Sequence, residues 1–295
     1  QYTLGWLIWF DANHTLHKVD ALGKQIVPSD RKIVFRFNGG MSEQSPTDML
    51  KFNDGDIYGA IFNPAISMDD DTTMRRLVRK VTSLRGLYLY NVPLSREGLA
   101  DIGAMLNLNW LFIYNRKHDA KAIASLNNLP QLRVLGLHGF TPVTPVLERL
   151  VRDHSKLERL GVESCHLTLN DLKLISQLHS LKRLDMAIGN FDLPDSALQG
   201  QIFDEIAKLK HLERVAINIG TTQVPNKRTV NTEIFKKWKG LKNLKLVAVV
   251  GYMPSKELEA VKANLHPGCA VIRDCQDGFG WTELEVEDPA IDHLW

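Results

Sequence analysis

The feature that most constrains this chain is a short apolar pattern, Leu-x-x-Leu-x-Leu, that recurs along most of its 295 residues. Successive copies are 24, 24, 25, 24, 31 and 29 residues apart. The copies begin at Leu84, Leu108, Leu132, Leu157, Leu181, Leu212 and Leu241. A period in the twenties indicates a solenoid, in which each repeat is too small to bury its own apolar face and must stack on its neighbours.

Each repeat is expected to combine a short strand with a helix. In the repeat that begins at Leu157, apolar residues occupy the first, fourth and sixth positions, as in a strand with one buried face. Residues 167–178 then place leucines and an isoleucine at helical spacing, and Thr168 or the pair Asn170 and Asp171 supplies a polar N-cap. The sequence therefore predicts the α/β class and a leucine-rich-repeat solenoid, with a curved parallel sheet on the concave face and helices or helical turns on the convex face.

The same frame extends beyond the seven clear copies. Ile57 fits the first position one repeat before Leu84, and Phe35 and Phe37 fit the last two apolar positions one repeat earlier. These copies predict nine strands in one frame. A tenth strand near residue 270 fits in two registers. Its core positions are either Ala270 and Ile272, or Cys269 and Val271.

The repeat frame divides the chain into three regions. Residues 1–31 form an N-terminal apolar stub and capping helix, residues 32–273 form the leucine-rich-repeat solenoid, and residues 274–295 form an acidic C-terminal cap or tail. The capping helix is expected between His17 and Val27, because Leu16, Val19 and Leu22 recur at helical spacing. Such a helix would cover the open end of the apolar core.

The chain resembles bacterial leucine-rich-repeat proteins with about 24 residues per turn. Those proteins commonly open with an apolar anchor, continue with a helix that ends in a Leu-Gly pair, and then form an extended strand. The corresponding segments here are residues 4–10, 19–23 and 33–37. The sequence around Cys165 is also loosely similar to the cysteine-containing subtype of these repeats. The resemblance covers roughly residues 1–273 and implies, by analogy alone, a module for protein interaction.

The first ten residues are almost wholly apolar and carry no charged side chain. They are half as long as the roughly 20 residues that a membrane-spanning helix needs. Two interpretations are open: the end of an upstream membrane anchor, with Trp6 and Trp9 at the membrane interface, or a segment that packs onto the first repeat. The sequence does not start with Met, which favours the anchor and display outside the cytoplasm; a cytoplasmic location is the alternative.

The overall charge is balanced, but its distribution is not. The net charge of +2 argues against a general nucleic-acid-binding protein. Residues 204–245 contain ten Lys or Arg and four Asp or Glu, whereas residues 274–292 contain seven acids and no Lys or Arg. The acidic segment is expected to cap the last repeat or to fold back onto the basic region. The two longest repeats carry insertions around residues 191–196 and 221–230.

Catalytic and metal-binding patterns are weak. His14 and His17 are three residues apart, without a Cys or carboxylate at ligand spacing. Asp69, Asp70 and Asp71 resemble a cation site in isolation, but acids are also favourable at the N-terminus of the helix expected there. The chain contains neither a Gly-x-Ser-x-Gly motif nor a phosphate-binding loop. We therefore expect a protein that is not an enzyme and has no cofactor and no metal ion.

Three cysteines, Cys165, Cys269 and Cys275, are too few for a disulfide framework. Cys269 and Cys275 are six residues apart, which is roughly 20 Å in an extended chain. Because the Cα atoms of a disulfide lie at roughly 4.4–6.8 Å, a bridge between these two cysteines requires a turn.

Aromatic residues gather at the strand positions that are expected to face the concave surface. The third, fifth and seventh positions alternate with the core positions, and neighbouring strands lie about 4.8 Å apart. Tyr88, Tyr90, Trp110, Phe112 and Tyr114 should therefore form one cluster, bordered by Val134 and His138. We expect these rings to be largely exposed and to anchor a partner, rather than only to stack along the sheet. If the rings are buried packing, the insertions near Phe191 and Pro225 become the better candidates.

Arginines continue the concave face beyond the aromatic residues. Arg159, Arg183 and Arg214 occupy the third position of successive strands, and Glu163 and Asp185 lie between them. This combination suits a protein, a peptide or an anionic glycan. The predicted binding residues are Tyr88, Tyr90, Trp110, Phe112, Tyr114, His138, Arg159 and Arg183. The alternative function is structural, in a cell-surface assembly that associates through its own repeats.

Overall fold

The structure is a computed structural model that describes residues 5–11, 13, 15–21, 25–38, 52–63, 71–114, 120–187, 196–218, 231–250 and 253–274. The chain divides into two compact units: unit 1 runs as far as Leu132 and unit 2 starts at Arg133. Within each unit, parallel strands alternate along the chain with helices, which is the predicted α/β leucine-rich-repeat architecture. Among the described residues, no helix is both long enough and apolar enough to cross a membrane.

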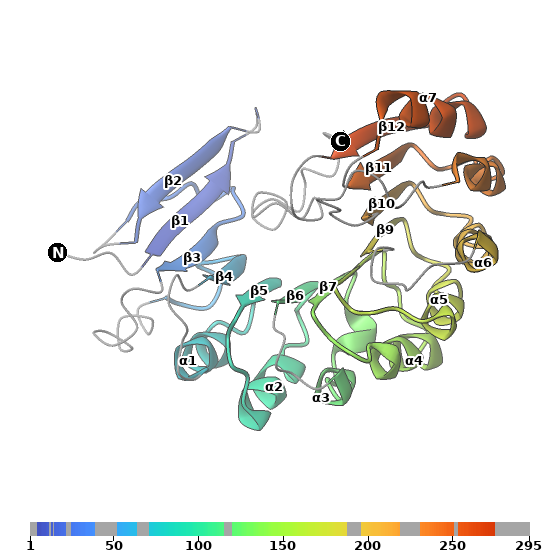
Figure 1. The fold of residues 1–295 in the computed structure, drawn as a ribbon. Helices are drawn as coiled ribbons and strands as arrows, with labels where there is room; N and C mark the ends of the chain where they lie inside the picture. Colours follow the sequence, from blue (N-terminus) through green and yellow to red (C-terminus); the bar gives the residue numbers. More distant parts are fainter. Residues whose placement is uncertain are drawn as a thin grey trace. The chain divides into compact units, whose positions relative to one another are not determined.

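Unit 1 contains the strand order β2-β1-β3-β4-β5-β6, in which β3 to β6 are parallel (Figure 1). The strands are β1 (Gly5–Phe10), β2 (Leu16–Asp20), β3 (Val34–Asn38), β4 (Gly59–Asn63), β5 (Gly86–Tyr90) and β6 (Trp110–Tyr114). The helices are α1 (Thr72–Lys80), α2 (Arg96–Gly103), α3 (Ala120–Ala124) and the 3-10 helix η3 (Leu129–Gln131). Helices α1 and α2 lie side by side on one face of the parallel strands.

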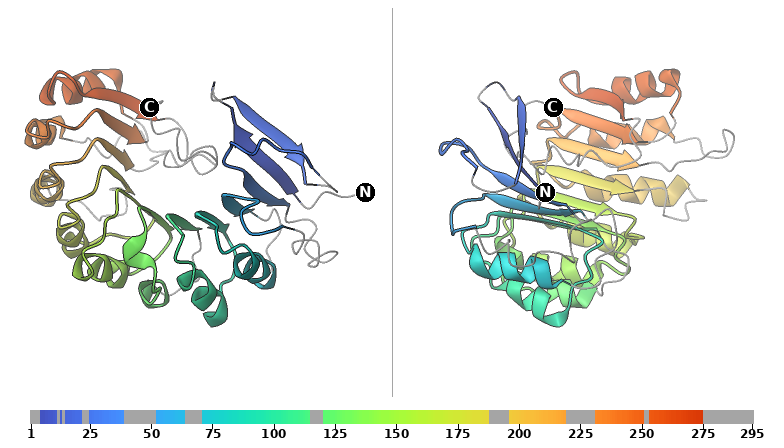
Figure 2. Two further views of the ribbon diagram at one scale, coloured as in Figure 1. Left: turned by 180° about the vertical axis from the view of Figure 1, so that it is seen from behind. Right: turned by 90° about the vertical axis from the view of Figure 1, so that its left-hand side faces the viewer.

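The described part of unit 2 contains six strands in chain order, and each neighbouring pair of them is parallel. The strands are β7 (Val134–His138), β8 (Arg159–Glu163), β9 (Arg183–Ala187), β10 (Arg214–Asn218), β11 (Leu246–Val250) and β12 (Ala270–Asp274). The helices are α4 (Thr144–Arg152), α5 (Leu169–Ile175), α6 (Ser196–Ile206), the 3-10 helix η4 (Thr232–Trp238) and α7 (Ser255–Asn264). All of them lie on one face of this sheet (Figure 2).

The apolar core follows the predicted positions. Leu84, Leu87 and Leu89 of one repeat are fully buried, and so are Leu135 and Leu160 in unit 2. Each strand directs these side chains toward its own helix, because side chains alternate between the two faces of a sheet. The opposite face, which we call the inner face, carries the third, fifth and seventh positions of each repeat.

The predicted capping helix between His17 and Val27 is wrong. Residues 16–20 form β2, which pairs antiparallel with β1, and β1 in turn pairs antiparallel with β3. The carboxylate of Asp11 accepts hydrogen bonds from the backbone N–H groups of Asn13 and Thr15, which supports the turn between β1 and β2. The apolar segment thus extends the sheet of the first repeat, and a strand, not a helix, borders it.

Aromatic side chains explain why β2 is a strand despite its helical spacing of apolar residues. The ring of His17 stacks on Trp9 with centroids 5.4 Å apart, and Lys18 lies over the ring of Trp6 at 3.9 Å. Both contacts join directly facing or neighbouring cross-strand positions of the antiparallel pair. A helix would have left the edge of β1 without a partner strand.

The strand after Leu241 is displaced by three residues from the predicted frame. Counting from Leu241 places Leu244 and Leu246 in the core, but β11 starts at Leu246, which pairs in register with Arg214. Leu246 is therefore an inner-face residue, and Val247 takes its place in the core. Two overlapping copies of the apolar pattern fit this sequence equally well, so only strand pairing selects one.

The tenth parallel strand exists as β12, in the register that places Val271 beside Val247. Val271 is therefore on the core side, and Ala270 and Ile272 are on the inner face. Cys269 is a free, buried thiol, and the residues that follow it form an extended strand instead of the turn that a disulfide would need. Cys165 is also free and buried.

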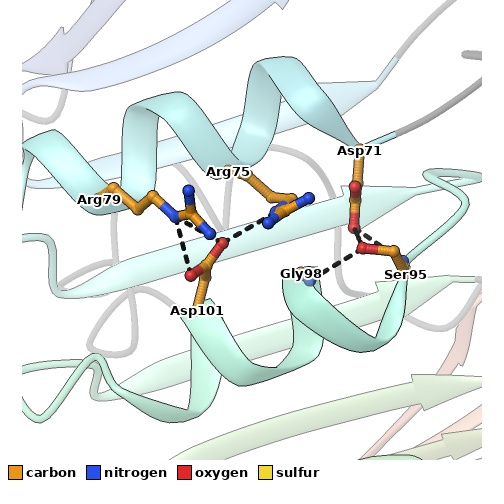
Figure 3. A network of polar contacts seen from close by, with 6 residues as sticks. All are labelled: Asp71, Arg75, Arg79, Ser95, Gly98 and Asp101. Carbon is orange, nitrogen blue, oxygen red and sulfur yellow. Dashed lines mark hydrogen bonds and ion pairs between the residues drawn. The ribbon is translucent and has the colours of Figure 1, made fainter.

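Polar contacts between successive repeats fix the helices against one another (Figure 3). Asp71, at the N-cap of α1, accepts hydrogen bonds from the backbone N–H and hydroxyl of Ser95, at 2.7 and 2.8 Å. Ser95 is itself the N-cap of α2 and accepts from the N–H of Gly98. The guanidinium groups of Arg75 and Arg79 both contact the carboxylate of Asp101. Asp71 therefore acts as a structural acid at a helix N-terminus.

The predicted cap of α5 is confirmed. Thr168 accepts a hydrogen bond from the backbone N–H of Asp171, and the Asp171 carboxylate accepts from the backbone N–H of Thr168. The same carboxylate accepts from the Thr144 hydroxyl of the preceding repeat at 2.6 Å. In both units a buried aspartate thus links the starts of two consecutive helices.

Several predicted features lie outside the described residues. These are the first four residues, Asp69 and Asp70, His14, the two insertions around residues 191–195 and 221–230, and the acidic segment from residue 275 onward.

Candidate binding surface

The inner face of unit 1 is built from large apolar side chains. Strand pairing aligns Val34, Gly59, Gly86 and Trp110 in one row, and Ile61, Tyr88 and Phe112 in the next. Five aromatic residues of β5 and β6 gather here as predicted, and Tyr88 and Phe112 have ring centroids 5.8 Å apart. Tyr90 and Tyr114 stack at 4.2 Å.

The predicted exposure of this aromatic cluster is wrong. Trp110 and Phe112 retain only 3% and 7% of their accessible surface, and Tyr88, Tyr90 and Tyr114 are half-buried. Val34 and Ile61, on the same face, are fully buried. The inner face of unit 1 is therefore a second apolar layer, and Trp110 and Phe112 belong to its packing.

Two glycines explain how Trp110 is buried on a face of the sheet that carries no helices. A Cβ atom at Gly86 would lie 1.6 Å from Cε2 of Trp110, and one at Gly59 would lie 2.8 Å from Cζ2. The indole thus lies flat across the two neighbouring strands, directly on their backbone. Its Nε1–H is buried and has no hydrogen-bond partner among the described residues, so the packing of the indole must offset the free-energy cost of this unmade hydrogen bond.

On β8 to β10 the inner face of unit 2 carries small and charged side chains, and apolar residues of the neighbouring strands, Val134 and Leu246, flank them. Arg159, Arg183 and Arg214 are in register on β8, β9 and β10, and we call them the arginine row. The next row is the floor of the surface, and its residues are Gly136, Gly161, Asp185, Ala216 and Ala248. His138 and Glu163 form the third row.

A buried ion pair joins the arginine row to the floor. Nε of Arg183 donates to Oδ2 of Asp185 at 2.8 Å, and the two side chains are 6% and 0% exposed. The second oxygen of Asp185, Oδ1, is buried without a hydrogen-bond partner in the described part of the chain. A buried carboxylate oxygen that accepts no hydrogen bond is costly, and such groups need a functional or structural reason.

The third row holds a carboxyl group with an unusual acidity. Burial, reinforced by the nearby charge of Asp185, raises the pKa of Glu163 to about 8. Its carboxyl oxygen lies 3.8 Å from Nε2 of His138, which is also 3.3 Å from the hydroxyl of Ser164. At neutral pH, Glu163 is therefore mostly a carboxylic acid and can donate a hydrogen bond.

The structure divides the predicted site residues between the two units. Tyr88, Tyr90, Trp110, Phe112 and Tyr114 lie on the inner face of unit 1, and His138, Arg159 and Arg183 lie on that of unit 2. Their direction toward the inner face follows from the strand alternation, as predicted. The burial of Trp110 was signalled by the glycines at the same position of the two preceding strands, Gly86 and Gly59, which leave space for a large neighbour.

Among the described residues, no group of three or more His, Cys, Asp or Glu side chains is arranged to hold a metal ion. Burial raises the pKa of Cys165 to about 12, so this thiol is not a ready nucleophile.

Comparison with solved structures finds a similar fold at low sequence identity. Its fold can be superposed on a crystal structure of an internalin from Listeria monocytogenes with a TM-score of 0.43 and 16% sequence identity. The alignment covers 75% of this chain and 62% of the internalin chain, so this chain spans less than two thirds of that structure. No family model matches the sequence, and no curated protein matches it.

Proposed function

We propose that this protein is a non-catalytic recognition module and that the inner face of unit 2 is its binding surface. The observation that carries the proposal is the buried pair Arg183 and Asp185, with an Asp185 oxygen left without a partner. The core of a repeat needs no charges on the opposite face of its sheet, and burying them costs free energy. Charged groups held there suit a protein or peptide ligand, with a glycan as the other ligand class.

The resemblance to bacterial leucine-rich-repeat proteins supports recognition as the function only by analogy. A bacterial source, display outside the cytoplasm and anchoring by an upstream membrane helix belong to the same proposal.

A random peptide display library tests the proposed function. Peptides selected on the intact protein are measured against a double variant of the inner face, Arg159→Ala with Glu163→Ala. The matched control is Arg152→Ala with Glu148→Ala, which replaces the same two residue types on α4, on the helical face. We expect binding to fall at least tenfold for the first variant and to stay within twofold for the second. Equal binding by both variants would show that the inner face of unit 2 is not the binding surface.

The alternative, assembly through the repeats themselves, is favoured by a different observation. Among the described residues, β2 and β12 are terminal strands of the sheet, and a terminal strand can pair with another chain through its edge. Leu16 on β2 and Ile272 on β12 are large apolar residues with 42% and 39% of their surface exposed. Sedimentation velocity between low and high micromolar concentration distinguishes the two functions: concentration-dependent association that Leu16→Lys or Ile272→Lys abolishes would favour assembly.

A further inference from the structure

Unit 2 carries exposed lysines at one edge of its sheet. A short turn follows each of its helices and leads into the next strand, and because β8 to β12 are parallel, these turns lie at the same edge. The turns contain seven lysines and three acids, a surplus of four positive charges, and all seven lysines are exposed. We call this set of turns the basic edge; it consists of residues 153–158, 176–182, 207–213, 239–245 and 265–269.

The equivalent turns of unit 1 are nearly uncharged. They are residues 81–85, 104–109 and 125–132, and Arg85 is their only charged residue. Asn128 shows how a neutral side chain serves such a turn: its Nδ2 donates to the backbone oxygens of Ile102 and Met105 at 2.9 and 3.0 Å. The repeat therefore closes its turns without lysine, and the basic edge of unit 2 is not a requirement of the fold.

The helix dipole does not account for the lysines either. A cation is stabilised at the C-terminus of a helix, but this effect falls off beyond the last turn. Lys156, Lys210 and Lys242 each lie four residues after the last residue of the preceding helix. Their positive charge therefore needs another explanation.

The acids of the basic edge neutralise only some of its lysines. Asp153 pairs with arginines of α4, whereas Glu158 and Glu213 pair with Lys182 and Lys245 at 3.0 and 2.6 Å. The lysines of the basic edge that form no ion pair with a described residue are Lys156, Lys210, Lys239 and Lys242.

Three of these lysines lie in two neighbouring turns that are fixed against each other. Nδ2 of Asn243 donates to the backbone oxygen of Lys210 at 2.9 Å, which joins turn 239–245 to turn 207–213. Nζ of Lys210 donates to the backbone oxygen of Ala207, a neutral acceptor that leaves its charge uncompensated. Together with Lys239 and Lys242, it gives this part of the edge three uncompensated positive charges.

The composition of the basic edge indicates the chemistry of its partner. The ammonium of lysine is a strongly hydrated point charge on a flexible stem, whereas the guanidinium of arginine suits paired hydrogen bonds with a single carboxylate or phosphate. The basic edge contains no Arg, Phe, Tyr or Trp, and all of its leucines are buried. It therefore offers charge, with no ring to stack on a base and no apolar side chain to insert into lipid tails.

Such an edge suits a surface that carries many phosphate groups. Clusters of lysines are attracted to anionic lipid headgroups by charge, without a shaped pocket. Duplex nucleic acid also carries phosphates, but proteins read its major groove with a helix or a β-ribbon. The helices of unit 2 lie on one face of their sheet, so none projects from the basic edge (Figure 2).

We propose that the basic edge binds the phosphate headgroups of an anionic lipid membrane, reversibly and by charge alone. The basic edge is separate from the inner face, so this inference does not rest on the proposed function.

Co-sedimentation of the full chain with lipid vesicles tests the inference. The vesicles are pure phosphatidylcholine, or phosphatidylcholine with about a third phosphatidylglycerol as the anionic lipid. We expect binding to the anionic vesicles and none to the neutral ones. Because salt screens exposed charges, raising NaCl from about 0.05 M to about 0.5 M should weaken the binding at least tenfold.

Two charge-matched double variants then locate the contact. Lys239→Gln with Lys242→Gln should weaken binding about tenfold or more, since each lysine near an anionic membrane contributes about fivefold in affinity. Lys173→Gln with Lys256→Gln removes two exposed lysines from α5 and α7 and should leave the affinity within twofold.

Four results would overturn the inference. Equal binding to both kinds of vesicle, or equal losses for the two double variants, would show that the basic edge is not the contact. Binding that survives the higher salt would mean that apolar insertion, not charge, holds the protein. Displacement by millimolar inorganic phosphate would assign the lysines to the free ion, and equally tight binding of a labelled DNA duplex through Lys239 and Lys242 would assign them to nucleic acid.

Discussion

The two units share one repeat architecture but use their inner faces differently. In unit 1, Trp110 and Phe112 are buried in an apolar layer over the glycines of neighbouring strands. In unit 2, the equivalent rows hold arginines, small residues and a buried aspartate. The backbone therefore does not decide what the inner face does, because alternate positions of a strand are independent of its core. The comparison indicates that the inner face of unit 1 contributes to stability, whereas that of unit 2 carries charged groups.

The largest expected effect is a difference in the free energy of unfolding between a substitution on the inner face of unit 1 and one on the inner face of unit 2. Trp110→Ala should lower the free energy of unfolding by about 3–5 kcal/mol, because it removes a buried indole and leaves a cavity. Arg159→Ala, on the inner face of unit 2, should cost less than about 1 kcal/mol. Chemical denaturation of both variants measures the difference. Similar losses for the two substitutions would mean that both inner faces are part of the packing.

A second prediction concerns the glycine beneath Trp110. Gly86→Ala should destabilise by about 1–3 kcal/mol, since its Cβ would overlap the indole ring. The cost should largely disappear in the Trp110→Ala background, which a double-mutant cycle in urea measures. Gly240→Ala is the control, because a Cβ there meets nothing within 4 Å. Additive effects of the Gly86 and Trp110 substitutions would show that the two residues do not contact each other.

The third prediction tests the charged face through its pH dependence. The pKa of Glu163 is raised to about 8, above its ordinary value of 4.5, so the folded state holds a proton that the unfolded state releases between these two values. Stability from this group is therefore greatest at or below pH 4.5 and declines as the pH rises toward 8. Glu163→Gln should remove this decline and raise the stability by about 1–2 kcal/mol at pH 8, after the cost of burying an amide.

Glu158, the residue directly before β8, is the matched control for this pH dependence. Partial burial by itself would raise the pKa of Glu158, but the hydrogen bonds and charges of Lys182 and Arg133 together outweigh it and lower this pKa. Its contribution to stability is thus present above its ordinary pKa and is lost as the pH falls through the lowered one. Denaturation at pH 4, 6 and 8 should show Glu158→Gln with its largest loss at high pH, opposite in sign to Glu163→Gln. The same sign for both variants would contradict the raised pKa of Glu163.

The smallest expected effect is the loss of stability on removal of a helix N-cap, which compares the helical faces of the two units. Ser95→Ala in unit 1 and Thr168→Ala in unit 2 each remove an N-cap, and each should cost about 1 kcal/mol. Thermal unfolding at pH 7 is sensitive enough to compare the two. If one cap costs several times more than the other, the difference between the units is not confined to the inner face.

The sequence was a good guide to the elements that repeat. Core residues such as Leu135 and Leu160, the cap at Thr168 and the strand near residue 270 were all predicted, because each depends on residues close together in the chain. The prediction of a helix between His17 and Val27 was wrong for the opposite reason. Its segment is a strand through contacts with β1, which local spacing does not reveal.

The order of the parallel strands, the core faces of β3 to β10 and the α/β repeat architecture were determined by the sequence alone, since apolar periodicity and alternation act within a single repeat. The register of β11, the burial of Trp110 and the pairing of Arg183 with Asp185 were decided only by the tertiary structure. The first two depend on which residues of neighbouring strands lie side by side, whereas Arg183 and Asp185 lie on the same strand and only their burial depends on the surrounding structure. Burial is a property of such neighbours, so a side chain that the pattern directs toward solvent can still be covered by them.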